Sequence, residues 1–261
     1  MVARGFVGLA LASLAAAAAA GGCDKIEARG LAKEGNDLYR AGKMAEALDA
    51  FERAARLDPD FPTLQLHIGY AAMALSTSAG PGRREVHATR AIRAFARFRE
   101  LAPADERGAK FYLQMLLDTG RLEEALRFLR RQHADNPRDV KVVASLGMVS
   151  SKLGRFDDAL EWYEKRAALL PDEPRERYLV GTLCWQHLYK NTAVVGAERV
   201  AIADRGIAAL EQALKLRPDY GEALTYINLL YRERARGQGD AAAREADMAR
   251  ARSYYKRALK V

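Results

Sequence analysis

The sequence predicts an all-α protein made of about six helix-turn-helix repeats, with no β-sheet. Small and apolar residues recur three and four positions apart, which places them on one face of a helix. Five prolines follow such stretches: Pro59, Pro103, Pro137, Pro171 and Pro218. Their intervals of 44, 34, 34 and 47 residues indicate a repeat with insertions. No stretch alternates apolar and polar residues as a strand typically does.

Each predicted repeat has two helical segments joined by a turn. Proline ends the second segment, because it cannot donate a backbone hydrogen bond and restricts the residue before it. The second helices are expected within residues 45–59, 90–103, 123–137, 157–171 and 205–218, and the first helices within 30–42, 64–75, 109–120, 142–154, 178–189 and 223–235. Gly42, Gly120 and Gly154 fall in the turns, where a residue that tolerates positive φ is useful.

Small residues indicate where the paired helices approach closely. The pairs are Gly35 with Ala47, Gly69 with Ala91, Gly147 with Ala159, and Gly181 with Gly206. The side chains at a contact set the distance between helix axes, so a bulky residue at these positions would push the helices apart. We therefore interpret these positions as structural.

With these features the sequence resembles the tetratricopeptide repeat (TPR) family. The resemblance covers nearly all of the chain after Cys23, as units 28–61, 62–105, 106–139, 140–173, 174–220 and 221–261. It implies a right-handed superhelix, or α-solenoid, in which stacked units share one continuous core. Units two, five and six carry extra residues between their helices.

The first 22 residues have the layout of an export signal. Arg4 supplies a positive charge, residues 5–20 are apolar, and small residues follow. A retained membrane span is disfavoured, because half of the stretch is alanine, which contributes little to insertion. Ala18-Ala19-Ala20 offers a site for ordinary cleavage, which would give a soluble secreted protein.

The favoured alternative is lipid attachment at Cys23. Residues 20–23, Ala-Gly-Gly-Cys, resemble the bacterial lipobox, although Ala20 stands where that motif usually has leucine. This resemblance implies a cleaved signal peptide (1–22), a palmitate-carrying Cys23, and a short tether (23–27). The localisation expected is the bacterial cell envelope, with the protein facing the periplasm and anchored in the inner or the outer membrane.

Residues for catalysis or metal binding are sparse. The four histidines show no pair at metal-ligand spacing, and two cysteines exclude a disulfide scaffold. Cys184 and His187 are the nearest approach to a catalytic pair, but Cys184 lies within an apolar helix, where a buried thiol is the simpler interpretation. We therefore predict a non-enzymatic protein with no cofactor and no metal, and keep an enzyme that uses Cys184 and His187 as the alternative.

The TPR resemblance implies a partner-binding groove lined by the first helix of each unit. Carried over by alignment, the groove positions are Asn36, Tyr39, Leu66, Tyr70, Met73, Lys110, Gln114, Leu117, Lys141, Met148, Tyr178, Thr182, Trp185 and Arg232. This mixture of aromatic, methionine and cationic side chains suits a peptide with apolar anchors and some acidic character. About half of these residues are expected to be exposed, since some will pack against adjacent units.

The chaperone-type carboxylate clamp is disfavoured, because only Asn36 matches it, while Ala32, His67 and Phe111 do not.

The net charge of +8 permits several anionic partners. The insertions hold many of the cations: Arg83, Arg84, Arg90, Lys190, Arg199, Arg234, Arg236 and Arg244. They predict either a basic edge that meets anionic lipid or, more simply, extended helices with paired charges, such as Glu245 near Arg244.

An exported protein seldom meets nucleic acid, and no small-molecule site is evident. The function expected is a membrane-anchored scaffold that binds a peptide or protein partner during assembly of a cell-envelope complex.

Overall fold

The computed structural model describes the backbone of residues 7–261 and the side chains of residues 23–261. This part of the chain contains twelve α-helices and no strand, which confirms the predicted all-α class. The helices are α1 (Val7–Arg40), α2 (Met44–Leu57), α3 (Pro62–Ser78), α4 (Pro81–Leu101), α5 (Glu106–Asp118), α6 (Leu122–Asp135), α7 (Val140–Lys152), α8 (Phe156–Leu169), α9 (Pro174–Lys190), α10 (Gly196–Leu216), α11 (Gly221–Gly237) and α12 (Ala241–Ala258).

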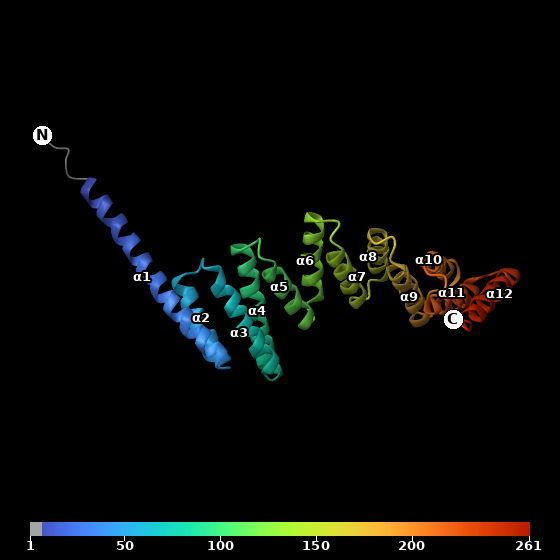
Figure 1. The fold of residues 1–261 in the computed structure, drawn as a ribbon, viewed down its shortest axis with the longest axis horizontal. Helices are drawn as coiled ribbons and strands as arrows, with labels where there is room; N and C mark the ends of the chain where they lie inside the picture. The colour runs from blue at the N-terminus through green and yellow to red at the C-terminus, as the bar shows by residue number, and fades with distance from the viewer. Residues whose placement is uncertain (1–6) are drawn as a thin grey trace. The chain divides into compact units, whose positions relative to one another are not determined.

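The chain divides into two compact units, and the first comprises residues 1–121. Within it α1 packs on α2 and α3 on α4, while α2 also contacts α3 and α4 contacts α5 (Figure 1). Its core contains Phe51, Leu64, Phe95 and Leu116, whose side chains are almost completely removed from water. Each helix therefore packs chiefly on its sequence neighbours, as a repeat architecture requires.

The second unit comprises residues 122–261 and holds α6 to α12. α7 packs on α8, α9 on α10, and α11 on α12, and α9 also contacts α11. One cluster of buried side chains extends from Leu160 in α8 to Ala251 in α12. Stacking of successive helix pairs thus gives this unit a core that no single pair could form.

The boundary between the units falls between α5 and α6, inside the predicted third repeat. The sequence predicted one continuous solenoid after Cys23, whereas the structure divides into two compact units. α5 has a thin apolar stripe, because it buries only Gly108, Met115 and Leu116, fewer residues than either α4 or α6 buries.

The turn glycines behave as the sequence predicts. Gly42, Gly120 and Gly154 have φ of 76°, 70° and 72°. After α1, the amide of Lys43 donates to the carbonyl of Leu38 at 2.9 Å, and Gly42 N donates to Tyr39 O at 3.1 Å. This closing pattern needs a left-handed residue, which glycine supplies without steric cost.

Paired helices approach closely at the predicted glycines, but the contacting partner lies one turn further along. A Cβ on Gly35 would lie 2.5 Å from Cε1 of Phe51, four residues after Ala47. In the other pairs the contact partners of Gly69, Gly147 and Gly181 are Phe95, Tyr163 and Leu210. Helical side chains lean toward the N-terminus, so a large residue covers the turn before its own Cα. The sequence located the close approach and missed the ring or branched side chain that fills it.

Two glycines of α1 provide a matched test of this close approach. Nothing lies within 4 Å of a Cβ placed on Gly30, whereas one on Gly35 meets the buried Phe51 ring. Gly35→Ala should lower the free energy of unfolding by about 1–3 kcal/mol through overpacking. Gly30→Ala should raise it by up to about 1 kcal/mol through helix propensity. Urea unfolding followed by circular dichroism measures both, and equal effects would contradict the assigned contact.

The predicted insertions turn out to lengthen helices. α7 and α8 have 13 and 14 residues, whereas α3 has 17 and α4 and α10 have 21 each. Many of the insertion arginines are paired, so the basic edge considered above does not form as a row of free cations. Arg90 pairs with Glu52, while Glu245 pairs with Arg252 and not with Arg244 as the sequence suggested.

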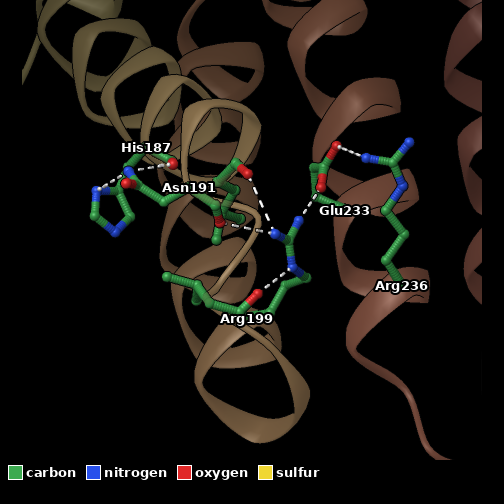
Figure 2. A network of polar contacts seen from close by, with 7 residues as sticks. His187, Asn191, Arg199, Glu233 and Arg236 are labelled. Atoms are coloured by element: carbon green, nitrogen blue, oxygen red, sulfur yellow. Dashed lines mark hydrogen bonds and ion pairs between the residues drawn. The ribbon is translucent and has the colours of Figure 1, made fainter.

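Arg199 is the clearest departure from that basic edge, because its side chain is buried. Figure 2 shows the network of polar contacts around it. Its guanidinium pairs with Glu233 of α11, which also accepts from Arg236 Nη1 at 2.9 Å. The same guanidinium donates from Nε to Val194 O at 2.7 Å and from Nη2 to Asn191 O at 3.1 Å. Arg199 therefore ties the C-terminal end of α9 and the turn after it to α10 and α11.

A second buried carboxylate joins α12 to its neighbours. Asp247 accepts from Arg234 Nε and from Gln238 Nε2, both at 3.1 Å. Arg234 also donates to Asp204 of α10 through Nη1 at 2.6 Å. Only Asp247 and Ala251 of α12 are buried, so polar contacts provide much of its attachment.

The buried pair of Arg199 and Glu233 should contribute far more to stability than an exposed pair. Arg199→Met removes the donor of several carbonyl oxygens and leaves the buried Glu233 carboxylate with Arg236 as its remaining cation, and should lower the free energy of unfolding by about 3–5 kcal/mol. Arg252→Met removes the exposed Arg252–Glu245 pair, and should change it by less than about 1 kcal/mol. Denaturant unfolding of the two variants tests this difference, and similar losses would refute it.

The predicted N-terminal signal is only partly covered by the structure. Residues 1–6 lie outside the described chain, and α1 begins at Val7 and continues through Cys23 to Arg40. Cleavage before Cys23 and its lipidation stay predictions. Among the described residues, none of the helices combines the length and the apolar character that crossing a membrane requires.

Candidate partner-binding surface

A small hollow lies on the first unit, between helices α1 and α3. It has a volume of about 110 Å³ and is lined by Asn36 and Tyr39 of α1, His67 and Tyr70 of α3, and Phe51 of α2. Phe51 is buried and forms its floor, with its ring centroid 5.1 Å from that of His67. The aromatic rings suit an apolar side chain of a bound peptide, and the Asn36 amide can hydrogen-bond to the peptide backbone beside it.

A larger pocket adjoins this hollow and shares Asn36 and His67 with it. Its volume is about 310 Å³, and α1 contributes Arg29, Lys33, Asn36 and Arg40 to its lining. These residues stand at positions i, i+4, i+7 and i+11, which is the spacing of one helix face. The opposite wall comes from Phe61 and the beginning of α3.

Helix α5 adds aromatic and charged groups to this side of the first unit. The Phe111 ring meets Tyr70 edge-on, with centroids 5.0 Å apart, and Lys110 Nζ lies 5.6 Å from the Phe111 centroid. Arg107 is held by Asp105, through a 2.6 Å ion pair. Burial and, to a lesser extent, the Arg107 charge lower the pKa of His67, so its imidazole is neutral at neutral pH.

A second aromatic cluster lies on the second unit, on helices α9 and α11. Trp185 stacks on Tyr189 and meets Tyr226 edge-on, with ring centroids 5.0 and 5.2 Å apart. Tyr226 also meets Tyr178, whose pKa is raised to about 12 chiefly by burial. Tyr189 is 63% exposed, so one side of this cluster is open to water. No pocket accompanies it among the better-formed pockets of the described chain, so the hollow of the first unit is the stronger candidate site.

Comparison with known families agrees with the repeat architecture. The family model described as "Tetratricopeptide repeat" matches residues 71–178, and one described as "TPR repeat" matches residues 35–76. Together these matches extend over residues 35–178, more than half of the chain. The chain belongs to the TPR family.

Comparison with solved structures gives several matches of low sequence identity. YrrB, described as a TPR protein with an unusual peptide-binding site, is 18% identical, with a TM-score of 0.45 over 74% of this chain and 88% of its own. A MamA structure is 17% identical, with a TM-score of 0.47 over 74% of this chain and 90% of its own. MamA from Desulfovibrio magneticus RS-1 is 19% identical, with a TM-score of 0.45 over 74% and 97%. Among curated proteins, none matches the sequence significantly.

The TPR alignment placed most of the expected groove residues at accessible positions. Asn36, Tyr39 and Tyr70 meet in the hollow of the first unit, and Tyr178 and Trp185 meet in the second-unit cluster. The side chains of Lys110, Gln114, Lys141 and Arg232 are exposed, and those of Met73, Leu117 and Met148 are half-buried. Arg232 also donates to Asn228 Oδ1 at 3.0 Å.

Two expected groove residues are wrong. Leu66 is only 2% exposed and packs into the core of the first unit, so it cannot contact a partner. Thr182 is 8% exposed, and its hydroxyl donates to Leu179 O at 3.0 Å within its own helix. Both residues face inward, on α3 and α9. An error of one residue in the alignment is enough to assign a core position of a helix to the groove.

Several residues of these surfaces were not expected from the sequence. Arg29, Lys33 and His67 line the pockets of the first unit, and Tyr189 and Tyr226 complete the second-unit cluster. The i, i+4, i+7 pattern on α1 and the four-residue step from Trp185 to Tyr189 could have indicated three of them, Arg29, Lys33 and Tyr189. Tyr226 was missed because the resemblance supplied only Arg232 as a groove position in the sixth unit.

The alternative of catalysis by Cys184 and His187 gains no support. Cys184 is completely buried, and burial raises the pKa of its thiol to about 12. His187 stacks on Phe156, with ring centroids 3.7 Å apart, and burial lowers the pKa of its imidazole. No group of three metal-ligating side chains occurs among the described residues.

The two cysteines should therefore differ sharply in reactivity. A thiol reagent at neutral pH should modify the exposed Cys23 of protein that lacks lipid, and should leave Cys184 unmodified. Because the raised pKa keeps the Cys184 thiol protonated, raising the pH moderately should not expose it to the reagent. Mass spectrometry of labelled peptides, with and without denaturant, tests this. Labelling of Cys184 in the folded protein would contradict the burial.

Proposed function

We propose that this chain is a TPR scaffold that binds a segment of a partner protein on the first-helix face of its first unit. The observation that carries the proposal is the hollow formed by Asn36, Tyr39, His67 and Tyr70, together with the cationic pocket beside it. The hollow supplies apolar walls and Asn36 supplies both a hydrogen-bond donor and an acceptor, a combination that recognises peptide backbone and side chain together.

We further propose that Cys23 anchors the scaffold to a bacterial membrane as a lipidated residue, facing the periplasm, where it takes part in assembly of a cell-envelope complex. The thiol is exposed, whereas the other cysteine is buried. Residues 23–27 are exposed and Ala28 is the first buried residue of the described side chains, which leaves a short tether for an anchor. Multiple acyl chains hold a protein on a membrane stably, whereas a single chain gives only marginal binding. A soluble secreted adaptor is the alternative.

The binding proposal is tested by photo-crosslinking. A benzoylphenylalanine side chain in place of Tyr39 should form a defined adduct with a partner in cells, and adding Asn36→Ala should reduce that adduct strongly. The same photoreactive side chain at Tyr255, which is 50% exposed on α12, serves as the control for random collision. Equal adducts from both positions would mean that the hollow is not a binding site.

The anchor is tested by labelling cells with palmitate. Wild-type protein should carry label and sediment with membranes, and Cys23→Ala should lose both properties while keeping its helical content. Label-free wild-type protein in the soluble fraction would support the secreted form. Membrane association of Cys23→Ala would refute lipid attachment at this residue.

A further inference from the structure

We propose that the segment bound by the first unit is an extended acidic segment, read at internal positions by a stripe of cations on α1. The stripe is Arg29, Lys33 and Arg40, with the Asn36 amide between the second and third cation. This inference rests on the proposed function and names the chemistry of the partner at the same site.

The charges along this pocket are unbalanced. Arg29, Lys33 and Arg40 line it together with a single carboxylate, that of Asp37. Arg40 lies 3.4 Å from Asp37 in a pair with both side chains largely exposed, so the pairing is weak. Neither Arg29 nor Lys33 forms an ion pair with any residue whose side chain the structure describes. A partner with carboxylates therefore supplies the counter-charges that the chain itself lacks.

The spacing of the cations favours an extended occupant. Lys33 follows Arg29 by four residues in the helix, which is about 6 Å along the helix axis. Alternate residues of an extended chain are about 6.6 Å apart and point to the same side. Carboxylates at positions i and i+2 of an extended segment therefore match these two cations.

The hollow extends this match to a third position. Asn36 and Tyr39 lie about 10 and 15 Å along α1 from Arg29, and residue i+4 of an extended segment lies about 13 Å from residue i. The side chain at i+4 thus reaches the aromatic hollow, whose volume of about 110 Å³ suits one aliphatic side chain. The inferred pattern is acid-x-acid-x-aliphatic, in either chain direction.

Recognition of acidic side chains within a segment, and not of a C-terminal carboxylate, distinguishes this site from the chaperone-type clamp. Ala32 and Phe111 stand where a clamp would place its cations, so the free carboxylate at a chain end has no dedicated partner. A flat anionic membrane surface also fits poorly, because Asn36 and His67 line a concave pocket between two helices.

The test uses full-length protein in zwitterionic detergent and fluorescein-labelled peptides with blocked ends. The probes are Gly-Ser-Asp-Ser-Asp-Ser-Leu-Ser-Gly-amide and its reversed sequence, each compared with versions that carry Asn for Asp or Ser for Leu. At least one direction should bind, as measured by fluorescence anisotropy. Replacement of Asp should weaken binding by about tenfold, and binding should fall as salt rises, since exposed charge pairs are screened.

Matched variants locate the binding on the stripe. Arg29→Gln/Lys33→Gln should weaken binding by about tenfold. The control Arg252→Gln/Lys256→Gln removes two exposed cations with the same four-residue spacing on α12, and should leave binding unchanged. Circular dichroism checks that both variants are folded.

Four outcomes would overturn the inference. Versions of both probes with a free C-terminal carboxylate are also measured: binding by these alone would indicate a clamp, and equal binding of the Asn peptides would exclude acid recognition. Failure of both peptides, together with stripe-dependent binding to phosphatidylglycerol vesicles, would assign the cations to a membrane. If the Tyr39 photo-adduct survives Arg29→Gln/Lys33→Gln, the proposed function stands and only the acidic partner is wrong. Absence of that adduct in the otherwise wild-type protein counts against the proposed function itself.

Discussion

The close approach of paired helices at a glycine is the constraint on which the rest of the structure depends. In several pairs the first helix has no Cβ at the contact, and a large buried side chain of the second helix occupies that space. The ring of Phe51 at Gly35 and the ring of Phe95 at Gly69 therefore set the distance between the axes of their helices. The first helices α1 and α3 hold their positions relative to each other through α2, so the hollow between Asn36, Tyr39 and Tyr70 inherits its shape from this packing.

In the second unit, buried charged residues also help to fix the relative positions of the helices. The longer helices α9, α10 and α11 meet around Arg199 and Glu233, and α12 is attached through Asp247. Hydrogen bonds in these networks are directional, and their carbonyl partners lie at the end of α9 and in the following turn. Apolar packing alone would fix the relative orientation of these helices less strictly, because the hydrophobic effect is non-directional. The networks thus orient the extended helices in a part of the fold where the repeat length is irregular.

The sequence predicted the fold well because its signals were local. Proline positions, turn glycines and helical periodicity each depend on a few neighbouring residues, and the helices and turns appear where these signals lie. The division into two units was not predictable in this way, since no local signal marks a boundary after Arg121, inside the third repeat. The pairing of Arg199 with Glu233 joins residues 34 positions apart, and no local pattern distinguishes such an arginine from a solvated one.

The candidate site was predictable only in part. Asn36, Tyr39 and Tyr70 follow from the register of the repeat, and the structure places them together. Leu66 and Thr182 failed because a step of one residue turns a helical side chain by about 100°, from the groove to the core. Arg29 and Lys33 could not be recognised as site residues from the sequence, because the pocket that they line also needs the wall contributed by α3.

The polar inner face of α12 affects how the second unit can open. Only an alanine and one aspartate of this helix are buried, and its Tyr254 hydroxyl donates to Glu211 of α10 at 3.1 Å. Detachment of α12 would therefore return the contacts of Asp247 and Glu211 to water, but it would also uncover the apolar residues of the core cluster against which Tyr254 and Ala258 pack. A local fluctuation that releases this helix thus presents apolar surface of α11, including Tyr231, and such exposed apolar patches are sites of self-association.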